Sequence, residues 1–336
     1  MYENDTLEFL DGLKRFGWKL GLDNIRNLLR RHGNPHQKIR AVHIAGTNGK
    51  GSTAAILESI CRAAGYRTGL FTSPHLLRVN ERIRLNGQEI GDQAFRSYVV
   101  QLREDVEQLG CTYFETLTAL AFLYFADQKI DLGIIEVGLG GRFDATNVLS
   151  PLLAIITRID LDHTDYLGSS LREVALEKAG IVKPAVPCLF DSHHPVVSEV
   201  ISSVCGRVGA ESVPVTGVCS SEIRALTETG STVDLTLAGE ELPGLHLALP
   251  GGHQIQNLVL AVTATRLLRR HDFLADRESI YAGVQRVRWP ARLQLLQTRP
   301  GVLLDVAHNA AAVENVLAAI REIYDHERLV LVIGLL

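Results

Sequence analysis

The sequence predicts an α/β fold built on a mostly parallel sheet, and three observations support this prediction. Apolar runs at 41–45, 132–137 and 152–159 do not alternate with polar residues. Helical stretches separate these runs, which is typical of parallel strands that helices cover on both faces. Residues 231–242 do alternate, and they predict a small antiparallel sheet at one edge.

A glycine-rich stretch, Gly46-Thr47-Asn48-Gly49-Lys50-Gly51-Ser52-Thr53, follows the first apolar run and precedes a predicted helix over 54–64. Free N–H groups and the helix dipole make such a helix start attractive to anions. Glycines let the backbone approach a phosphate closely. Lys50 adds a positive charge for β- and γ-phosphates, and Ser52 or Thr53 offers a hydroxyl near a metal. This phosphate loop (46–53) predicts a nucleotide site.

The match of the phosphate loop to the usual P-loop pattern is imperfect. Two residues separate Gly46 from Gly49, and Gly51 stands between Lys50 and Ser52. An ordinary glycine-rich turn with a solvated lysine is therefore the alternative. The preceding strand and the following helix favour phosphate binding.

Composition limits the other classes of function. The 336-residue chain has a formal net charge of −4, which gives no reason to expect a nucleic-acid partner. Its five cysteines are widely spaced, which indicates buried thiols in a reducing compartment rather than disulfides or a zinc site. The acidic N-terminus is unlike a signal peptide, and no apolar run is long enough to span a membrane. We expect a cytoplasmic monomer without a membrane partner.

Periodicity places the remaining elements. Asn86-Gly87 within 82–90 predicts a hairpin. Helices are expected over 6–15, 23–31, 93–109, 115–127, 169–178, 254–270 and 277–288, and further strands over 66–72, 186–190 and 245–249.

The end of the chain predicts a second unit. Residues 297–301 have the composition of a linker, and 302–305, 310–324 and 329–333 indicate strand, helix and strand. So short a fragment cannot bury both faces of its sheet. We therefore divide the chain into two parts. They are 1–298, a P-loop-type nucleotide-binding domain with the antiparallel edge sheet, and 299–336, the start of an incomplete Rossmann-like α/β domain.

Polar residues follow the predicted parallel strands, where an open α/β sheet binds its ligands. Ser73, Glu136 and His163 reach that edge together with the phosphate loop. Such an oxygen-rich set with one imidazole suits Mg²⁺ that carries phosphates and water. Alternatively, Ser73 is a turn residue before a proline, His163 is structural, and the aspartates at 160 and 162 cap a helix. Glu136, late in an apolar strand, needs a partner or a metal.

Three further segments carry polar groups. The spacing and Arg142 in Gly138–Asp144 disfavour a nicotinamide site. Spacing alone makes Lys178 a solvated residue in the last turn of a helix. Asn257 is either buried and hydrogen-bonded to nearby residues, or it forms hydrogen bonds with the edge of an adenine base. Residues 305–309 end a strand at the cleft between the two units, where a nucleotide could be held from both sides.

Ordered motifs run along the whole chain. They are Gly46–Ser52, Thr72–Leu76, Thr112–Glu115, Glu136–Asn147, Asp162–Thr164 and Asp305–Asn309. Together they resemble the folylpolyglutamate synthase and dihydrofolate synthase family of the Mur-ligase superfamily. The resemblance also explains the shortened phosphate loop as a family variant.

The resemblance implies an ATP-dependent ligase. In such a ligase ATP phosphorylates a carboxylate of a folate, or of dihydropteroate. The amine of L-glutamate then attacks the acyl phosphate and gives an amide, ADP and phosphate. Lys50 and Mg²⁺ would neutralise charge on the transferred phosphoryl group.

The resemblance also implies roles for single residues. One or two Mg²⁺ ions would bind at Ser73, Glu136 and His163. The catalytic residues would be Lys50, His163 and Lys178. In this family the matching lysine is carbamylated, and the resemblance therefore replaces the interpretation of Lys178 as a solvated residue. The nucleotide would contact Thr47, Asn48, Gly49, Lys50, Gly51, Ser52, Asn257, Arg292, Asp305 and His308. The pterin side would contact Trp18, Lys19, Leu20, Thr112, Tyr113, Phe114, Glu115, Phe143, Asp144 and Ala145.

Two other functions stay open at this point. A related ligase could act on another acid, such as a cell-wall precursor, although residues 112–115 argue against it. A P-loop ATPase without ligation would release phosphate regardless of glutamate. Because family members continue past residue 336, we expect this polypeptide to be weakly active or inactive. Equal turnover by this chain and a longer one would contradict that expectation.

Overall fold

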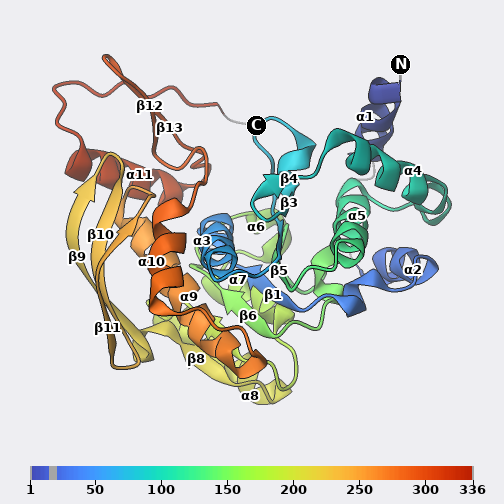
Figure 1. The fold of residues 1–336 in the computed structure, drawn as a ribbon, viewed down its shortest axis with the longest axis horizontal. Helices are drawn as coiled ribbons and strands as arrows, with labels where there is room; N and C mark the ends of the chain where they lie inside the picture. The colour runs from blue at the N-terminus through green and yellow to red at the C-terminus, as the bar shows by residue number, and fades with distance from the viewer. Residues whose placement is uncertain (1, 15–20, 335–336) are drawn as a thin grey trace.

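The computed structural model describes residues 2–14 and 21–334. An eight-stranded sheet lies at the centre of the described part, with the strand order β4-β3-β2-β5-β1-β6-β7-β8 (Figure 1). Neighbours from β2 to β8 pair in parallel, and β3 and β4 form an antiparallel hairpin on one edge. The strands are β1 (Ala41–Ala45), β2 (Thr68–Phe71), β3 (Ile83–Leu85), β4 (Gln88–Glu89), β5 (Leu132–Glu136), β6 (Leu153–Ile156), β7 (Cys188–Phe190) and β8 (Ser212–Pro214).

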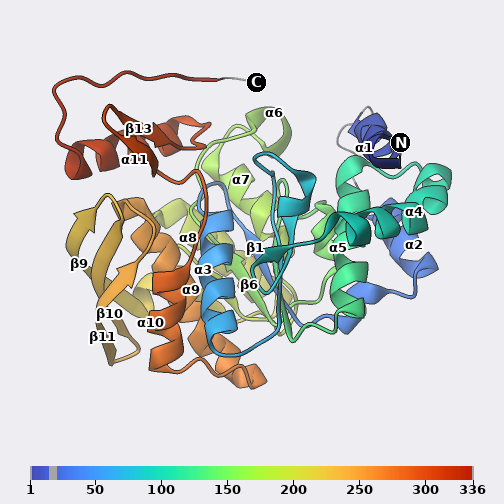
Figure 2. The same cartoon turned by 45° about the horizontal axis from the view of Figure 1, so that its top comes forward.

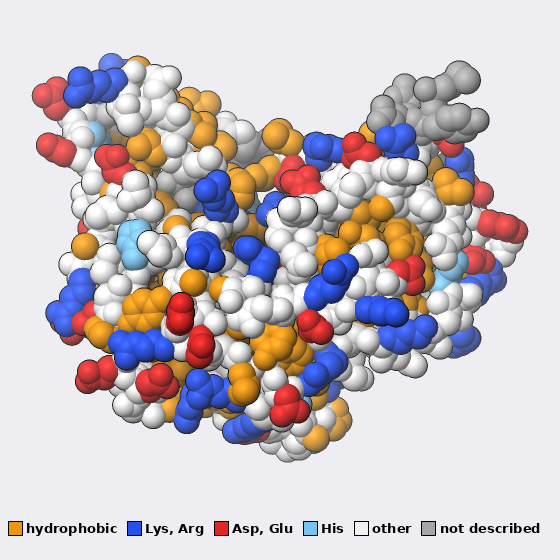
Figure 3. Space-filling view, viewed as in Figure 1, with side chains coloured by type: hydrophobic (Ala, Val, Ile, Leu, Met, Phe, Trp, Pro, Cys, Tyr) orange, Lys and Arg blue, Asp and Glu red, His pale blue; other side chains and the backbone are white. Residues whose placement is uncertain are grey.

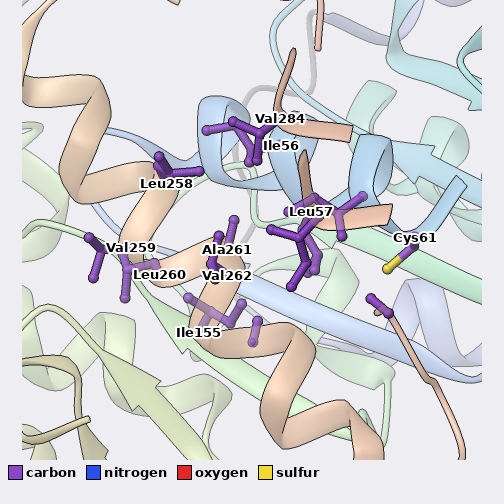
Figure 4. Close-up of a cluster of buried hydrophobic side chains, with 14 of the residues drawn as sticks. Ile56, Leu57, Cys61, Ile155, Leu258, Val259, Leu260, Ala261, Val262 and Val284 are labelled. Atoms are coloured by element: carbon purple, nitrogen blue, oxygen red, sulfur yellow. The ribbon is translucent and has the colours of Figure 1, made fainter. Parts of the chain in front are cut away.

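Helices cover both faces of this sheet. They are α1 (Tyr2–Leu13), α2 (Asp23–Arg31), α3 (Lys50–Ala63), α4 (Asp92–Leu109), α5 (Tyr113–Asp127), α6 (Thr164–Leu167), α7 (Leu171–Lys178), α8 (Pro195–Val208), α9 (Gly252–Leu268) and α10 (Arg277–Arg286). A further helix, α11 (Ala310–Ile323), belongs to a separate buried cluster. Helices α3, α9 and α10 share one buried cluster with the sheet (Figure 4), while α2, α4 and α5 and the α7–α8 pair belong to clusters on the other face.

Strand β1 shows why the parallel strands lack alternation. Val42 and Ile44 pack toward α3 and α9, whereas Ala41 and Ala45 pack on the opposite face, and all four are fully buried. Both faces of the strand therefore require apolar residues. The predicted fold class is confirmed.

The antiparallel sheet consists of β9 (Cys219–Thr227), β10 (Gly230–Leu237) and β11 (Glu240–Leu247). The predicted small antiparallel sheet is thus confirmed, and it is a separate sheet that packs against α9 and α10 (Figure 1). The sequence did not reveal β9, whose side chains are mostly exposed and so show no burial pattern.

The last described segment differs in part from the prediction. Strand β12 (Gln294–Thr298) pairs with β13 (Gly301–Leu304), so the expected linker at 297–301 is the turn of a hairpin. Figure 2 shows α11 beside this hairpin, above the β9–β11 sheet. The predicted strand over 329–333 is wrong, since residues 324–334 contain no helix or strand and pair with no neighbouring strand.

The structure also shows the state of the cysteines and the apolar character of the helices. Cys61, Cys111, Cys188, Cys205 and Cys219 are all buried free thiols, as expected. Within residues 2–14 and 21–334, no helix has both the length and the apolar character needed to cross a bilayer.

Candidate active site

A cavity of about 730 Å³ opens at the carboxyl ends of the parallel strands. Figure 3 shows this face of the molecule hollowed between two lobes, with Lys and Arg side chains beside the hollow. Every predicted nucleotide, metal and catalytic residue lines the cavity. They are Thr47, Asn48, Gly49, Lys50, Gly51, Ser52, Ser73, Glu136, His163, Lys178, Asn257, Arg292, Asp305 and His308.

The phosphate loop is fixed by the segment that follows β6. The backbone N–H groups of Thr47 and Asn48 donate to Arg158 O, at 2.9 and 3.2 Å. The Thr157 hydroxyl donates to Asn48 O at 2.8 Å. These bonds define the loop conformation before any ligand arrives, so little ordering remains to be done on binding.

Two glycines of the loop are required by its geometry. Gly46 and Gly49 have φ of 151° and 90°, which side chains of L-residues rarely adopt. A Cβ at Gly46 would lie 1.8 Å from the Thr157 hydroxyl, and one at Gly49 would lie 2.2 Å from Asn257 Oδ1. The loop therefore passes against two other elements at distances that only glycine permits.

Two lysines converge on one carbonyl of the loop. Lys50 Nζ donates to Gly46 O at 3.0 Å and to Thr47 O at 3.1 Å. Lys178 Nζ donates to the same Gly46 oxygen at 2.8 Å, and its residue is only 4 % exposed. Burial, assisted by the charge of Lys50, lowers the pKa of Lys178 to about 7. The interpretation of Lys178 as a solvated residue, based on spacing, was therefore wrong.

Glu136 is a buried carboxyl group at the end of β5. Its Oε2 accepts the Ser73 N–H at 3.0 Å. Burial raises the pKa of Glu136, although Lys50, that N–H group and the guanidinium of Arg292 oppose the rise. A divalent cation would favour the charged form, so the chemistry of this group fits a metal ligand.

His163 enters the cavity from the loop after β6. It adopts a left-handed conformation with φ 50°, and its N–H donates to Asp162 Oδ1 at 2.8 Å. Within the described ranges, no group of three His, Cys, Asp or Glu side chains is close enough to hold a metal alone. A site built on Glu136 and His163 would therefore also need the Ser73 hydroxyl, water or phosphate oxygens.

The opposite wall comes from α9 and the hinge at 289–309. Burial lowers the pKa of Arg292, and the nearby Asp305 opposes this. The Asp305 carboxylate accepts N–H groups from Leu293 at 2.7 Å and Ala307 at 2.8 Å, which holds the hinge in shape. Asn257 donates to Gln254 Oε1 at 2.9 Å, so part of its amide is used locally.

Comparison with known proteins agrees with this geometry. The Mur ligase middle domain model matches residues 44–265. The dihydrofolate synthase/folylpolyglutamate synthase of Bacillus subtilis is 38 % identical over 99 % of this chain and 79 % of that protein. The folylpolyglutamate synthase of Lacticaseibacillus casei is 30 % identical over 96 % of this chain and 78 % of that protein. Its apo structure superposes with a TM-score of 0.91 at 29 % identity, over 97 % of this chain and 82 % of that one.

This chain belongs to the folylpolyglutamate synthase and dihydrofolate synthase family of Mur ligases. The family resemblance inferred from the motifs is thereby confirmed. An FPGS complex with AMPPCP and folate has a TM-score of 0.90 to this chain at 29 % identity, covering 97 % of this chain and 82 % of that one.

None of the predicted pterin contacts that the structure describes lines the cavity. Trp18, Lys19 and Leu20 fall outside the described residues. Thr112 and Glu115 form a capping box at the start of α5, with reciprocal bonds of 3.2 and 2.7 Å. Their side chains thus have a structural task, and their substrate role stays a prediction.

The other predicted pterin contacts pack around the strand-end loops. Phe114 lies against Gly138, where a Cβ would meet its ring at 2.5 Å. Tyr113 stands 5.5 Å from the Arg82 guanidinium. Buried Asp144 accepts the N–H groups of Leu139 and Thr146, each at 3.0 Å. Next to it, Phe143 is partly exposed and Ala145 is buried.

Sequence reasoning missed some residues of the cavity wall. Arg84, from the β3–β4 hairpin, lies 5.1 Å from the centre of the Trp289 ring. Arg292, which was predicted, lies 5.9 Å from the same centre, so two guanidinium groups flank one indole. Arg84 is not at the end of a parallel strand, and the rule used to find the site could not point to it. The available signal for the indole was its position three residues before the predicted contact Arg292.

Proposed function

We propose that this chain catalyses the ATP-dependent addition of L-glutamate to a folate, with dihydropteroate as a second acceptor acid. The observation that carries the proposal is the convergence of the phosphate loop, Glu136 and Lys178 on one cavity. The names of the relatives and the AMPPCP–folate complex of a neighbour support the choice of nucleotide and acid.

The residues suit a two-step acyl transfer. An oxygen of the substrate carboxylate attacks the γ-phosphorus of ATP, and ADP leaves. The glutamate amine then attacks the acyl carbon, phosphate leaves, and the nitrogen loses a proton. N–H groups at the start of α3 would hold the phosphates. Lys50, already 3.0 Å from a loop carbonyl, would neutralise charge on the transferred group.

Two features concern the metal site. Ser73, Glu136 and His163 would hold Mg²⁺, which when bound neutralises phosphate charge. Lys178 would carry a carbamate and so act as an extra carboxylate. Its low pKa supports this, since only the neutral amine attacks CO₂ and much of the amine is neutral near pH 7.

The remaining proposals concern the location, the oligomeric state and the domain division of the enzyme. We propose that it acts as a cytoplasmic monomer on small-molecule acids, and light scattering of the purified chain would test the oligomeric state. The division into 1–298 and 299–336 also stays a proposal, because the β12–β13 hairpin spans that boundary.

A coupled assay of ADP release tests the function. We expect release with tetrahydrofolate or dihydropteroate only when L-glutamate is present. Lys50→Ala should lower kcat/KM about 100-fold, because the enzyme loses one positive charge that stabilises the transition state. Exposed Lys38→Ala, outside the cavity, is the matched control.

Other outcomes of that assay would change the conclusion. Phosphate release that does not respond to glutamate would favour an ATPase without ligation. Glutamate-dependent turnover retained in Lys50→Ala would remove the role assigned to this lysine.

A further inference from the structure

Asn309 links three elements through one amide. It caps α11, where its Oδ1 accepts the Ala312 N–H at 2.9 Å. The same Oδ1 accepts from Asn48 Nδ2 at 3.3 Å, and Asn309 Nδ2 donates to Asn48 Oδ1 at 3.1 Å. Nδ2 also donates to Asp162 Oδ2 at 3.0 Å. The helix of the C-terminal unit is thus bonded directly to the phosphate loop and to the loop after β6.

The two partners of Asn309 are themselves held in place. Asn48 lies mid-loop, and its Nδ2 also donates to Asp160 Oδ2 at 2.9 Å. Asp162 accepts the N–H of His163, the predicted metal ligand, at 2.8 Å. Any movement of Asn309 would therefore reach both the phosphate loop and the backbone that carries His163.

The amide is chemically suited to this position. Asn48 offers both a donor and an acceptor, while Asp162 offers only acceptors when ionised. An asparagine matches both partners at once, because its side chain carries donors and an acceptor. Aspartate would have no donor and would place a second negative charge beside Asp162. Serine would keep the helix cap but is too short to make the other bonds.

We propose that Asn309 is a positioning residue that fixes the C-terminal unit against the phosphate loop. Arg292 and Asp305 then face the loop across one nucleotide site. This inference rests on the nucleotide use in the proposed function. It goes further by assigning a task to a residue that contacts neither the reacting atoms nor the predicted metal.

The test uses Asn309→Ser and Asn309→Asp, which both retain a good N-cap residue. We expect each to unfold within about 2 °C of the parent protein. The dissociation constant of Mg-ATP, measured by calorimetry, should rise at least tenfold for Asn309→Asp and less for Asn309→Ser. KM for ATP should rise more than kcat falls. Asp276→Ser, a similar change at the exposed cap of α10, should leave nucleotide binding unchanged.

A double-mutant comparison separates coupling from general damage. If Asn309 acts through Asn48, the Asn48→Ala and Asn309→Ala variant should bind Mg-ATP little worse than Asn48→Ala alone. Unchanged nucleotide affinity of Asn309→Asp, or losses that multiply in the double variant, would overturn the inference. Failure of the parent protein itself to bind Mg-ATP would instead overturn the proposed function, and the inference with it.

Discussion

Lys178 lies in a buried position that favours the neutral amine over the charged ammonium group. Its Nζ reaches Gly46 O at 2.8 Å, and burial with the nearby Lys50 lowers its pKa to about 7. Asp162 and Asp144 act in the opposite direction without restoring the ordinary value of 10.5. The protonation of this side chain therefore differs between the folded and unfolded chains across several pH units.

Stability should depend on pH through this residue. The unfolded chain keeps the lysine proton up to about pH 10, while the folded chain loses it near pH 7. Between these values the unfolded state binds more protons, so the free energy of unfolding rises with pH, by up to about 1.4 kcal/mol per unit. Lys178→Met should lack this rise when urea unfolding is measured at pH 7, 8 and 9 in CO₂-free buffer. Parallel pH profiles for the two proteins would contradict the assignment.

At the scale of elements, the loop after β5 and the end of α7 are in close backbone contact. Arg142 N donates to Glu177 O at 3.0 Å. A Cβ on Gly141 would lie 2.7 Å from Glu177 O and 2.8 Å from Lys178 O. The glycine-rich segment between β5 and α7 thus sets the position of the helix turn that carries Lys178. Close packing, rather than the binding of a dinucleotide, explains the glycines of this segment.

Gly141→Ala should therefore push the last turn of α7 away from the cavity. We expect a loss of about 1–3 kcal/mol in the free energy of unfolding, as for other overpacked sites. A fall of at least tenfold in kcat/KM should accompany it. Gly206→Ala in α8 is the control, because nothing lies within 4 Å of its added Cβ, and it should stabilise the protein slightly. Unchanged activity in Gly141→Ala would show that this contact does not position Lys178.

At the scale of the whole molecule, the cavity has two walls from distant parts of the chain. One wall consists of the strand ends and the phosphate loop, and the other of α9 and the hinge. A nucleotide that touches both walls should stabilise both together, since ligand binding to the folded state alone raises stability.

Hydrogen exchange in the presence of Mg-ATP tests this arrangement. Amides at 46–52 and at 305–312 should both exchange more slowly, whereas those of the β9–β11 sheet should not change. At a nucleotide concentration 100 times the dissociation constant, the added stability should be about 2.7 kcal/mol. Slower exchange confined to 46–52 would show that the hinge does not take part in nucleotide binding.

Local sequence patterns were enough to predict the fold class, the phosphate loop and the hairpin at Asn86-Gly87, where both residues have positive φ. They also predicted the gathering of Ser73, Glu136 and His163 at one edge. These features depend on short-range rules: the periodicity of burial, the conformational freedom of glycine, and the common edge at which parallel strands end.

Only the folded structure revealed the burial of Lys178, the contact of Gly49 with Asn257 and the bond of Asn309 to Asn48. It also showed that the predicted strand at 329–333 does not form. Each of these depends on which distant elements pack together. A strand needs a neighbour to bond with, and the pKa of Lys178 falls mainly because other parts of the chain exclude water from it.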